Sequence, residues 1–255
     1  MITLDTIYNQ DCLEGMKQIE DHSIDCIIID PPYGMLNKKS ECGRWDNVIP
    51  FEPLWAQINR IKRPAAPVVI FAAGMFTAQV MMSNQPAWKY NLVWNKVRSV
   101  GFLNAKRMPL RVHEDICIFY DKKPTYNPQF TFGAPNHSRG INGTERQNHR
   151  CYGRVNKCRE TFSTHKYPNS IITIPTVKKG NIHPTEKPLN LMRYLIRTYS
   201  NPGDIVLDCC FGSGSTIVAS ILEHRHYIGF ELDSNYFQKA SVRINKEKQQ
   251  LTLNL

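Results

Sequence analysis

The feature that most constrains the fold lies near the end of the chain, where a strand, a glycine-rich turn and a helix follow one another. Residues 204–208 (Asp-Ile-Val-Leu-Asp) are typical of a buried strand, and Asn201-Pro202-Gly203 supplies a turn before it. Residues 211–216 (Phe-Gly-Ser-Gly-Ser-Thr) come next, followed by an apolar, helix-like run. Glycines let the backbone approach a ligand closely, and a helix start offers free N–H groups. The unit therefore predicts an α/β fold that cradles a nucleotide.

The spacing around this turn also indicates the kind of nucleotide. The next predicted strand ends in Glu231, 23 residues after Asp208, where an acid can accept hydrogen bonds from ribose hydroxyls. A dinucleotide fingerprint would have a third glycine where this chain has Ile217, and the Lys-Ser/Thr pair of a P-loop is missing. A cofactor with an adenosine but no phosphate fits better, and S-adenosylmethionine is the obvious one.

A second motif, Asp30-Pro31-Pro32-Tyr33, follows the apolar run Cys26-Ile27-Ile28-Ile29. The prolines fix their own φ angles and disfavour a helical conformation at the residue before each of them. A buried strand thus delivers a carboxylate, backbone carbonyls and an aromatic ring to one edge of a sheet. This set suits a planar ligand that carries an amino group, although a strand-ending turn with a polar cap would use the same residues.

Together the two motifs resemble the catalytic and cofactor motifs of amino-group DNA methyltransferases, and their order resembles that of the permuted beta class. Three further segments resemble that class. Residues 10–16 look like the acid-bearing turn at the cofactor's adenine, Trp94-Asn95-Lys96 resembles a segment beside the target-base pocket, and residues 183–188 resemble the segment before the cofactor strand. Cys209-Cys210 departs from the pattern, since relatives more often have Pro-Phe there.

The resemblance implies a Rossmann-like methyltransferase sheet of the α/β class, with circularly permuted motif order and an inserted, loop-rich target-recognition region. Residues 1–120 would form the catalytic half, residues 121–180 the insertion, and residues 181–255 the cofactor-binding half of the same domain. The implied reaction is site-specific transfer of a methyl group from S-adenosylmethionine to the N6 amine of an adenine, which must first flip out of duplex DNA.

The resemblance also implies which residues act. The catalytic set is Asp30, Pro31, Pro32 and Tyr33: Asp30 and the Pro31 carbonyl would accept the two amine N–H groups, and Tyr33 would stack on the base. Asp11 would lie near the cofactor's adenine, and Thr185 or Lys187 near its carboxylate. The full predicted cofactor set is Asp11, Cys12, Thr185, Lys187, Asp208, Phe211, Gly212, Ser213, Gly214, Ser215, Thr216, Glu231 and Leu232.

The distribution of charge indicates nucleic acid. The chain has a net charge of +10, and the stretch from Asp121 to Lys187 has 12 Lys/Arg against 4 Asp/Glu, a net +8. Clustered positive charge suits a phosphate backbone, and Arg, Asn and Gln can bind base edges; an inert solvated loop is the plain alternative. We predict double-stranded DNA as the partner, contacted by Arg139, Arg146, Arg150, Arg154, Lys157, Arg159 and Lys166.

Apolar spacing predicts the remaining elements. Residues 1–30 are typical of strand, helix and strand. Further helices are expected over 51–63, 75–82, 189–199 and 234–249, the last capped by Asp233 or Ser234, and further strands over 68–71, 90–94 and 115–120. From residue 122 to residue 170 the periodicity collapses, so a loop-rich region is expected there.

Other classes of protein fit less well. No apolar run approaches the ~20 residues of a membrane span, and an N-terminus with Asp5 and Asp11 is unlike a signal peptide. We therefore expect a cytoplasmic protein whose eight cysteines stay reduced. We predict no metal, because in the set His149, Cys151, Cys158 and His165 the two cysteines are too far apart for a zinc knuckle.

Several alternatives stay open. The same site could methylate the N4 amine of cytosine, which is the main alternative, and methylation of RNA is another. A catalytically inactive DNA-binding homologue would need only the basic segment, while a dinucleotide oxidoreductase is disfavoured by the glycine spacing. The resemblance to the beta class leads us to expect a homodimer. A cognate restriction endonuclease is the other partner considered, although this sequence does not show whether one accompanies the enzyme.

Overall fold

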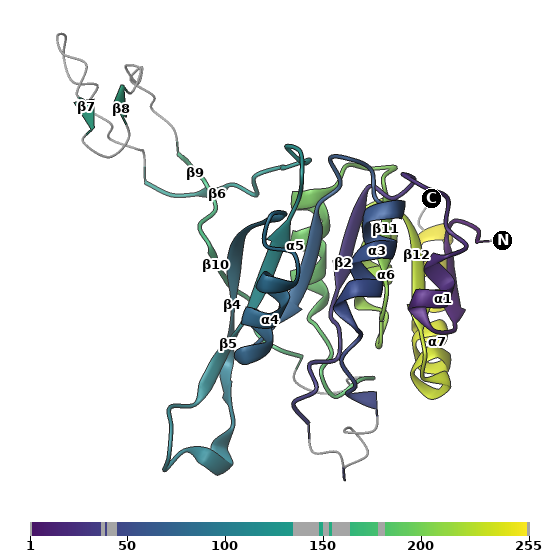
Figure 1. Cartoon of the computed structure of the whole chain (residues 1–255), viewed down its shortest axis with the longest axis horizontal. Helices are drawn as coiled ribbons and strands as arrows, with labels where there is room; N and C mark the ends of the chain where they lie inside the picture. Colours follow the sequence, from purple (N-terminus) through teal and green to yellow (C-terminus); the bar gives the residue numbers. More distant parts are fainter. Residues whose placement is uncertain are drawn as a thin grey trace. The chain divides into compact units, whose positions relative to one another are not determined.

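The structure is a computed structural model that describes residues 2–36, 39, 45–134, 148–149, 153–154, 164–177 and 182–253 (Figure 1). The chain divides into two compact units: Met1–Asn127 together with Ser170–Leu255, and Pro128–Asn169. We call the first the main unit and the second the small unit. The main unit contains both predicted motifs, and the small unit falls within the segment 121–180 that the resemblance marks as an insertion.

An eight-stranded sheet forms the centre of the main unit, in the order β1-β12-β11-β2-β3-β5-β4-β10. Neighbouring strands are parallel, except that β5 runs antiparallel to β3 and β4. The strands are β1 (Thr6–Asn9), β2 (Cys26–Ile29), β3 (Val68–Ala72), β4 (Trp88–Val100), β5 (Arg111–Phe119), β10 (Ile171–Thr173), β11 (Ile205–Asp208) and β12 (His226–Glu231).

Strands β2 and β11 lie side by side at the point where the order of the sheet reverses. From β2 the chain continues outward to β3, whereas from β11 it continues in the opposite direction to β12. Such a topological switch point leaves a crevice beyond the carboxyl ends of the strands, where open α/β sheets bind their ligands. Both predicted motifs begin at this crevice.

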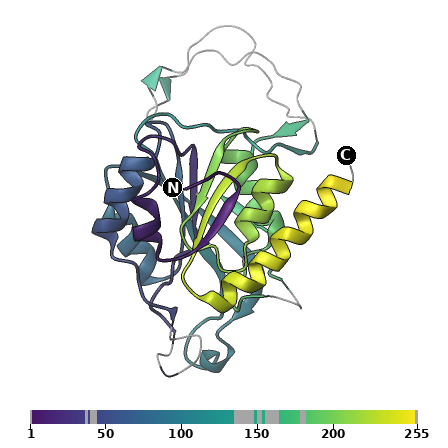
Figure 2. The same cartoon turned by 90° about the vertical axis from the view of Figure 1, so that its right-hand side faces the viewer.

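Helices cover both faces of the sheet, as Figure 2 shows. One face is covered by α1 (Cys12–Met16), α3 (Phe51–Ile61) and α4 (Met75–Ser83), and the other by α5 (Leu189–Tyr199), α6 (Ser215–Leu222) and α7 (Ser234–Leu253). Ile27 and Ile29 of β2 pack on the first face, and Cys26 and Ile28 on the second. Because this strand is buried on both sides, its sequence is a continuous apolar run rather than an alternating one.

The predicted elements of the main unit are confirmed, with ends shifted by a few residues. Two features were not predicted. One is the short strand β10, and the other is the hairpin by which β4 continues past Trp94 and β5 begins before Asp115, closed by the 3₁₀ helix η1 (Phe102–Asn104). Within the described part of the chain, no helix has the length and apolar character that a membrane span needs.

The small unit contains two short antiparallel pairs in its described part. Strand β6 (Thr131–Phe132) pairs with β9 (His165–Lys166), and β7 (Asn148–His149) pairs with β8 (Gly153–Arg154). The ring of Phe130 packs on that of Tyr167, with 4.8 Å between their centroids. Much of the segment expected to be loop-rich lies outside the described residues, so its loop-rich character stays a prediction.

The cap of α7 gives a direct test of the fold. Oδ1 of Asp233 accepts the N–H groups of Asn235 (2.9 Å) and Tyr236 (3.0 Å). We expect Asp233→Ala to lower the free energy of unfolding by about 1 kcal/mol, because these two N–H groups lose their acceptor. Asp233→Asn keeps a side-chain acceptor, so it should retain most of the stability that the cap contributes. Urea unfolding measures both variants, and an alanine variant as stable as wild type would contradict the role of the cap.

Candidate functional site

The two predicted motifs meet at the carboxyl edge of the sheet. Val206 of β11 lies opposite Cys26 of β2, so the segments that follow the two strands leave the sheet together. The thiol of Cys210 donates to the backbone oxygen of Asp30 at 3.4 Å, which joins the glycine turn to the proline motif directly. A ligand held by the turn after β11 would therefore lie next to the Asp30 carboxylate.

Both carboxylate oxygens of Asp30 are hydrogen-bonded. The Tyr33 hydroxyl donates to Oδ1 at 3.0 Å, and Nζ of Lys187 donates to Oδ2 at 2.5 Å. The Tyr33 ring stacks on Phe76 of α4, with a centroid distance of 4.9 Å and an interplanar angle of 24°. Lys187, which the resemblance places near the cofactor's carboxylate, is paired here with the carboxylate of the proline motif.

Lys187 is part of a chain of four alternating charges, which we call the charge chain: Asp30, Lys187, Glu114 and Lys96. Nζ of Lys187 lies 3.4 Å from Oε2 of Glu114, and Oε1 of Glu114 accepts from Nζ of Lys96 at 2.9 Å. The side chains of Lys187 and Lys96 are both 7% exposed. Since Glu114 is on β5 and Lys96 on β4, the charge chain connects the motif after β2 to the β4–β5 hairpin.

Burial and charge act against each other along the charge chain. Burial raises the pKa of Asp30, and the Lys187 ammonium opposes that rise. Burial would also raise the pKa of Glu114, but the ammonium groups of Lys187 and Lys96 hold it below its ordinary value. Burial would lower the pKa of Lys187, yet the Asp30 and Glu114 carboxylates raise it. Each charge favours the ionised form of its neighbour, because a buried charge without a partner is strongly unfavourable.

The glycine turn has the left-handed backbone that its sequence requires. Gly212 and Gly214 have φ angles of +49° and +77°, which side chains rarely adopt, and α6 begins immediately after Gly214. The Glu231 carboxylate reaches across the turn: Oε2 accepts from the Gly212 N–H at 2.9 Å, and Oε1 from the Asp233 N–H at 2.8 Å. The acid at the end of β12 is thus held against the turn after β11.

A second buried carboxyl group lies at the start of the same turn. Burial raises the pKa of Asp208 to about 7, against the effect of hydrogen bonds from the Thr216 hydroxyl and the Cys210 N–H. The Cys210 N–H donates to Oδ1 of Asp208 at 3.1 Å. Burial also raises the pKa of Glu231. Two carboxyl groups of this kind are suitable acceptors for the hydroxyl and amino groups of a bound nucleoside.

The turn before α1 supplies the remaining polar groups. Oδ1 of Asp11 caps this helix by accepting the N–H groups of Leu13 (2.8 Å) and Glu14 (3.2 Å). The side-chain amide nitrogen of Gln10 is buried and has no hydrogen-bond partner within the described residues. A buried donor left unpaired is costly, and a ligand acceptor can satisfy it. This donor, the two acids and the glycine turn together fit a cofactor that contains adenosine.

Three aromatic rings that were not among the predicted site residues pack together, and one of them, His183, lies beside the glycine turn. The His183 ring packs on Trp45 (4.8 Å between centroids) and on Tyr236 (4.2 Å), and a Cβ added at Gly212 would lie 3.7 Å from it. Burial lowers the pKa of His183 to about 4, so its imidazole is neutral at pH 7. Thr185 is exposed, and its hydroxyl lies 3.0 Å from Nδ1 of His183.

The other predicted cofactor residues fall into three environments. Phe211, Ser213, Ser215 and Thr216 are buried within the turn and the first residues of α6. Cys12 is buried in α1, whereas Leu232 is exposed after β12.

Glu114 was missed although a signal for it exists. It is an acid two positions before the apolar run 116–119 of β5, and in the register of the hairpin it lies opposite Trp94. A carboxylate at the border of a buried strand needs a cation as its partner. The sequence does not identify that cation, because Lys96 and Lys187 come close to Glu114 only in the folded structure.

Most of the residues that were predicted to contact DNA are not described by the structure. Arg139, Arg146, Arg150, Lys157 and Arg159 lie outside the described residues, while Arg154 is in β8 and Lys166 in β9 of the small unit. Of the residues weighed for zinc, Cys151 and Cys158 also lie outside them. Within the described residues, no group of three His, Cys, Asp or Glu side chains could hold a metal ion.

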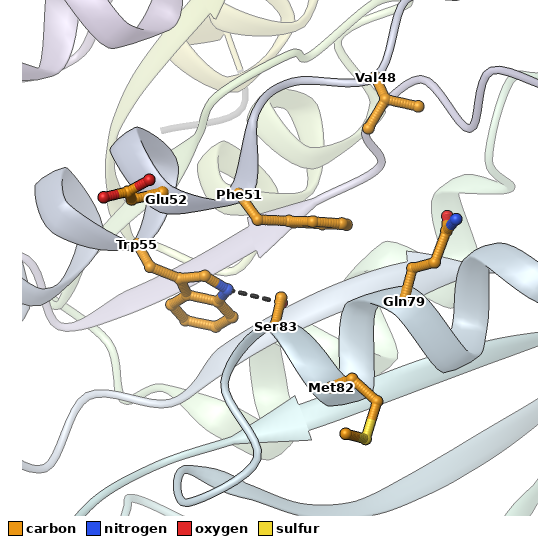
Figure 3. A pocket seen from close by; sticks show the side chains of 7 residues that line it. All are labelled: Val48, Phe51, Glu52, Trp55, Gln79, Met82 and Ser83. Carbon is orange, nitrogen blue, oxygen red and sulfur yellow. Dashed lines mark hydrogen bonds between the residues drawn. The ribbon is translucent and has the colours of Figure 1, made fainter.

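A separate groove of about 880 Å³ lies between α3 and α4. Figure 3 shows the residues that line it, with Nε1 of Trp55 donating to Oγ of Ser83 at 2.8 Å. Phe51 belongs to the groove and also stacks on Phe76, which in turn contacts Tyr33. None of the predicted site residues that the structure describes lines this groove, so we assign the chemistry to the edge of the sheet. The lining residues are Val48, Phe51, Glu52, Trp55, Gln79, Met82 and Ser83.

The chain is similar to known DNA methyltransferases over nearly its full length. It is 25% identical to the type II methyltransferase M1.MboII of Moraxella bovis, over 96% of this chain and 98% of that one. It is 26% identical to the type II methyltransferase M.HinfI of Haemophilus influenzae, over 96% of this chain and 69% of that one.

Solved structures show the same fold. The M1.HpyAVI–SAM complex superimposes with a TM-score of 0.61 at 24% identity, covering 94% of this chain and 98% of that chain. The PvuII DNA methyltransferase, described as cytosine-N4-specific, gives 0.65 at 16% identity, covering 93% and 85%. The expected Rossmann-like methyltransferase fold is therefore confirmed.

A family model described as DNA methylase, of the N6/N4 type, matches residues 24–242. This range includes the proline motif, the charge chain and the glycine turn. The chain belongs to the N6/N4 DNA methylase family.

Proposed function

We propose that this protein is a site-specific, S-adenosylmethionine-dependent DNA methyltransferase that acts on the N6 amine of adenine in duplex DNA. The observation that carries the proposal is the position of Asp30, at the switch point of the sheet, beside the glycine turn and bonded through both carboxylate oxygens. The type II methyltransferases M1.MboII and M.HinfI, which this chain resembles over 96% of its length, support DNA methylation in a restriction-modification context.

The cofactor would be held by the groups around the glycine turn. Asp208 and Glu231 would accept hydrogen bonds from its hydroxyl and amino groups, and the Gln10 amide would donate to an acceptor of its adenine. The glycines at 212 and 214 let the backbone approach the ligand closely. When bound, S-adenosylmethionine supplies an electrophilic methyl group on a positively charged sulfur.

The proline motif activates the amine. The exocyclic amine of adenine is a poor nucleophile, because its lone pair is delocalised into the ring. Oδ1 of Asp30 accepts one amine N–H once the Tyr33 hydroxyl leaves it, and the Pro31 carbonyl accepts the other. Tyr33 then stacks on the flipped base, and the Asp30 carboxylate stabilises the positive charge that develops on the nitrogen. In this scheme the Tyr33 hydroxyl occupies the place of the amine until the base arrives.

Adenine is proposed because the family resemblance implies it: relatives whose proline motif begins with Asp are more often adenine enzymes than cytosine enzymes. The N4 amine of cytosine is the alternative, since the same two acceptors would bind it and the PvuII enzyme of the same fold is cytosine-N4-specific. A homodimer and a cognate restriction endonuclease are proposed partners on the strength of the same resemblance.

The base and the recognition site can be found in one experiment. The chain is expressed in a methylation-free bacterial host, whose genome is then sequenced by a method that detects methylated bases. We expect methyladenine in one short motif, and Asp30→Ala should lower it at least about a hundredfold while cofactor binding persists. Detection of methylcytosine instead would show that cytosine is the target base. A genome without methylated bases would contradict DNA as the substrate. An active Asp30→Ala variant would contradict the role of Asp30.

Lys187→Met tests the charge chain. Without the ammonium the Asp30 carboxylate loses its buried partner, so its pKa rises further, and the acidic limb of the kcat/KM profile should move to higher pH by at least about one unit. Lys187→Arg keeps the cation and should shift the limb less. Cofactor affinity is measured in parallel. If it falls while the pH profile stays unchanged, Lys187 serves the cofactor's carboxylate, as the resemblance implies, and not Asp30.

Asp208→Asn tests the buried acid of the turn. The pKa of Asp208 is raised from 3.8 to about 7, so the folded protein binds this proton more tightly than the unfolded chain. Its contribution to stability is present at low pH and is lost as the pH rises from about 4 to about 7. We expect the free energy of unfolding of the variant minus that of wild type to be greater at pH 8 than at pH 5. Thermal unfolding across this range measures the difference, and a difference that does not change with pH would contradict the assignment.

A further inference from the structure

The β4–β5 hairpin continues beyond the sheet at the edge where the proline motif lies. Strand β4 is parallel to β3 and β2, so its last residues lie at their carboxyl edge, and Figure 1 shows the hairpin running past the other strands there. Lys96, at the root of the hairpin, belongs to the charge chain that ends at Asp30. The root of the hairpin is therefore fixed to the catalytic carboxylate through buried ion pairs.

The second strand of the hairpin also starts beside the proline motif. A Cβ added at Gly74, in the turn between β3 and α4, would lie 3.8 Å from Cε of Met35 and 3.9 Å from Nη1 of Arg111. Met35 follows Tyr33 by two residues, and Arg111 is the first residue of β5. Both strands of the hairpin thus leave the sheet next to the predicted pocket for the target base.

A bulge separates the root of the hairpin from its tip. Asn95 pairs with His113 and Val100 with Arg111, so the four β4 residues between these pairs oppose a single residue on β5. Val97, within the bulge, has a φ of +64°, and its N–H is bound by Oδ1 of Asn95 at 3.0 Å. Bulges bend a strand and re-aim its side chains, and they are frequent next to active sites.

The tip is an ordered turn with exposed apolar side chains. Its backbone is closed by hydrogen bonds from Asn104 to Gly101 (2.9 Å), from Ala105 to Phe102 (3.1 Å) and from Met108 to Asn104 (3.0 Å). Phe102 is 77% exposed and Leu103 is 84% exposed. Large apolar side chains presented this fully by an ordered turn are typical of an interaction site.

The charge of the hairpin indicates what it meets. The sequence from Asn95 to Arg111 contains five Lys/Arg residues and no Asp or Glu. Lys96 is used in the charge chain, and the other four are exposed, on both sides of the apolar tip: Arg98, Lys106, Arg107 and Arg111. Exposed cations that flank an apolar tip are complementary to phosphates on either side of a groove, with bases between them.

We propose that the β4–β5 hairpin is a DNA wedge, in which Phe102 and Leu103 enter the base stack next to the target base and the flanking cations bind the backbone. A flipped base leaves a gap in the stack, and an inserted apolar side chain offsets part of the unstacking cost. The six residue-to-residue steps from Lys96 to Phe102 span at most about 20 Å, enough to cross a major groove about 12 Å wide. The inference rests on the proposed function, because it names how that site obtains its base.

Methylation of two matched duplexes tests the wedge. Both contain the site found by genome sequencing, and in the second the target base faces an abasic position, so that it is already unpaired. We expect Phe102→Ala/Leu103→Ala to lower kcat/KM at least about tenfold on the paired duplex and much less on the abasic one. The control is Met82→Ala/Val242→Ala, which removes apolar side chains that are 67% and 72% exposed on α4 and α7. Its kcat/KM, relative to wild type, should be the same on the two duplexes.

The other outcomes are equally informative. An equal loss on both duplexes would overturn the wedge in favour of general DNA binding, and no loss on either would overturn it altogether. Sedimentation of the same variants covers a third case: if the hairpin double variant alone dissociates a dimer and leaves paired-duplex methylation intact, the tip is a contact between copies of this chain.

A second measurement does not depend on methyl transfer. Phe102→Trp adds an indole at the tip, and its emission is obtained by subtracting that of the wild-type protein, which has four tryptophans. We expect duplex DNA to quench this added emission and to protect it from acrylamide, because the ring stacks between bases. Unchanged emission with bound DNA would overturn the wedge. If wild type transfers no methyl group while the added indole is quenched, the proposed function fails and the wedge stands.

Discussion

The buried charge chain is the interaction on which the arrangement of the catalytic edge depends. It joins four parts of the sequence: the motif after β2, the segment before α5, and the facing strands β4 and β5. An unpaired charge at any of these positions would be strongly unfavourable, so removing one partner destabilises the others. Position and ionisation are therefore coupled, because the ammonium that aims the Asp30 carboxylate also opposes the effect of burial on its pKa.

Around the glycine turn, by contrast, some polar groups lack a partner that a bound ligand can supply. Asp208 is buried and has a raised pKa, and the Gln10 amide nitrogen lacks a partner within the described residues. Such groups are costly in a protein that binds nothing. The proline motif is instead self-satisfied, since Tyr33 and Lys187 bind both oxygens of Asp30. One half of the site is thus ready for its cofactor, while the other must exchange a hydrogen bond before the base can bind.

Much of this could be predicted from the sequence, because local patterns carried it. The apolar runs before Asp30 and Asp208 gave the central strands, and the spacing from Asp208 to Glu231 gave the acid that closes the turn. Contacts between distant segments could not be predicted in this way. Glu114 and Lys96 have no local pattern that relates them to residue 187, and Trp45 meets His183 and Tyr236 only in the fold. The extended hairpin was missed because its exposed residues have no apolar periodicity.

The pairing of β1 with β12 has a consequence for how the chain folds during synthesis. Asn9 pairs with Glu231, 222 positions later, so β1 has no partner in the sheet until these further residues have been made. Contacts this distant in sequence slow folding, and a strand edge left unpaired is prone to wrong association. The cofactor turn would also form after β2 and β3, since it joins β11 to α6, which are made later. Ribosome-bound fragments should therefore acquire the central strands β2 and β3 before they acquire any affinity for the cofactor.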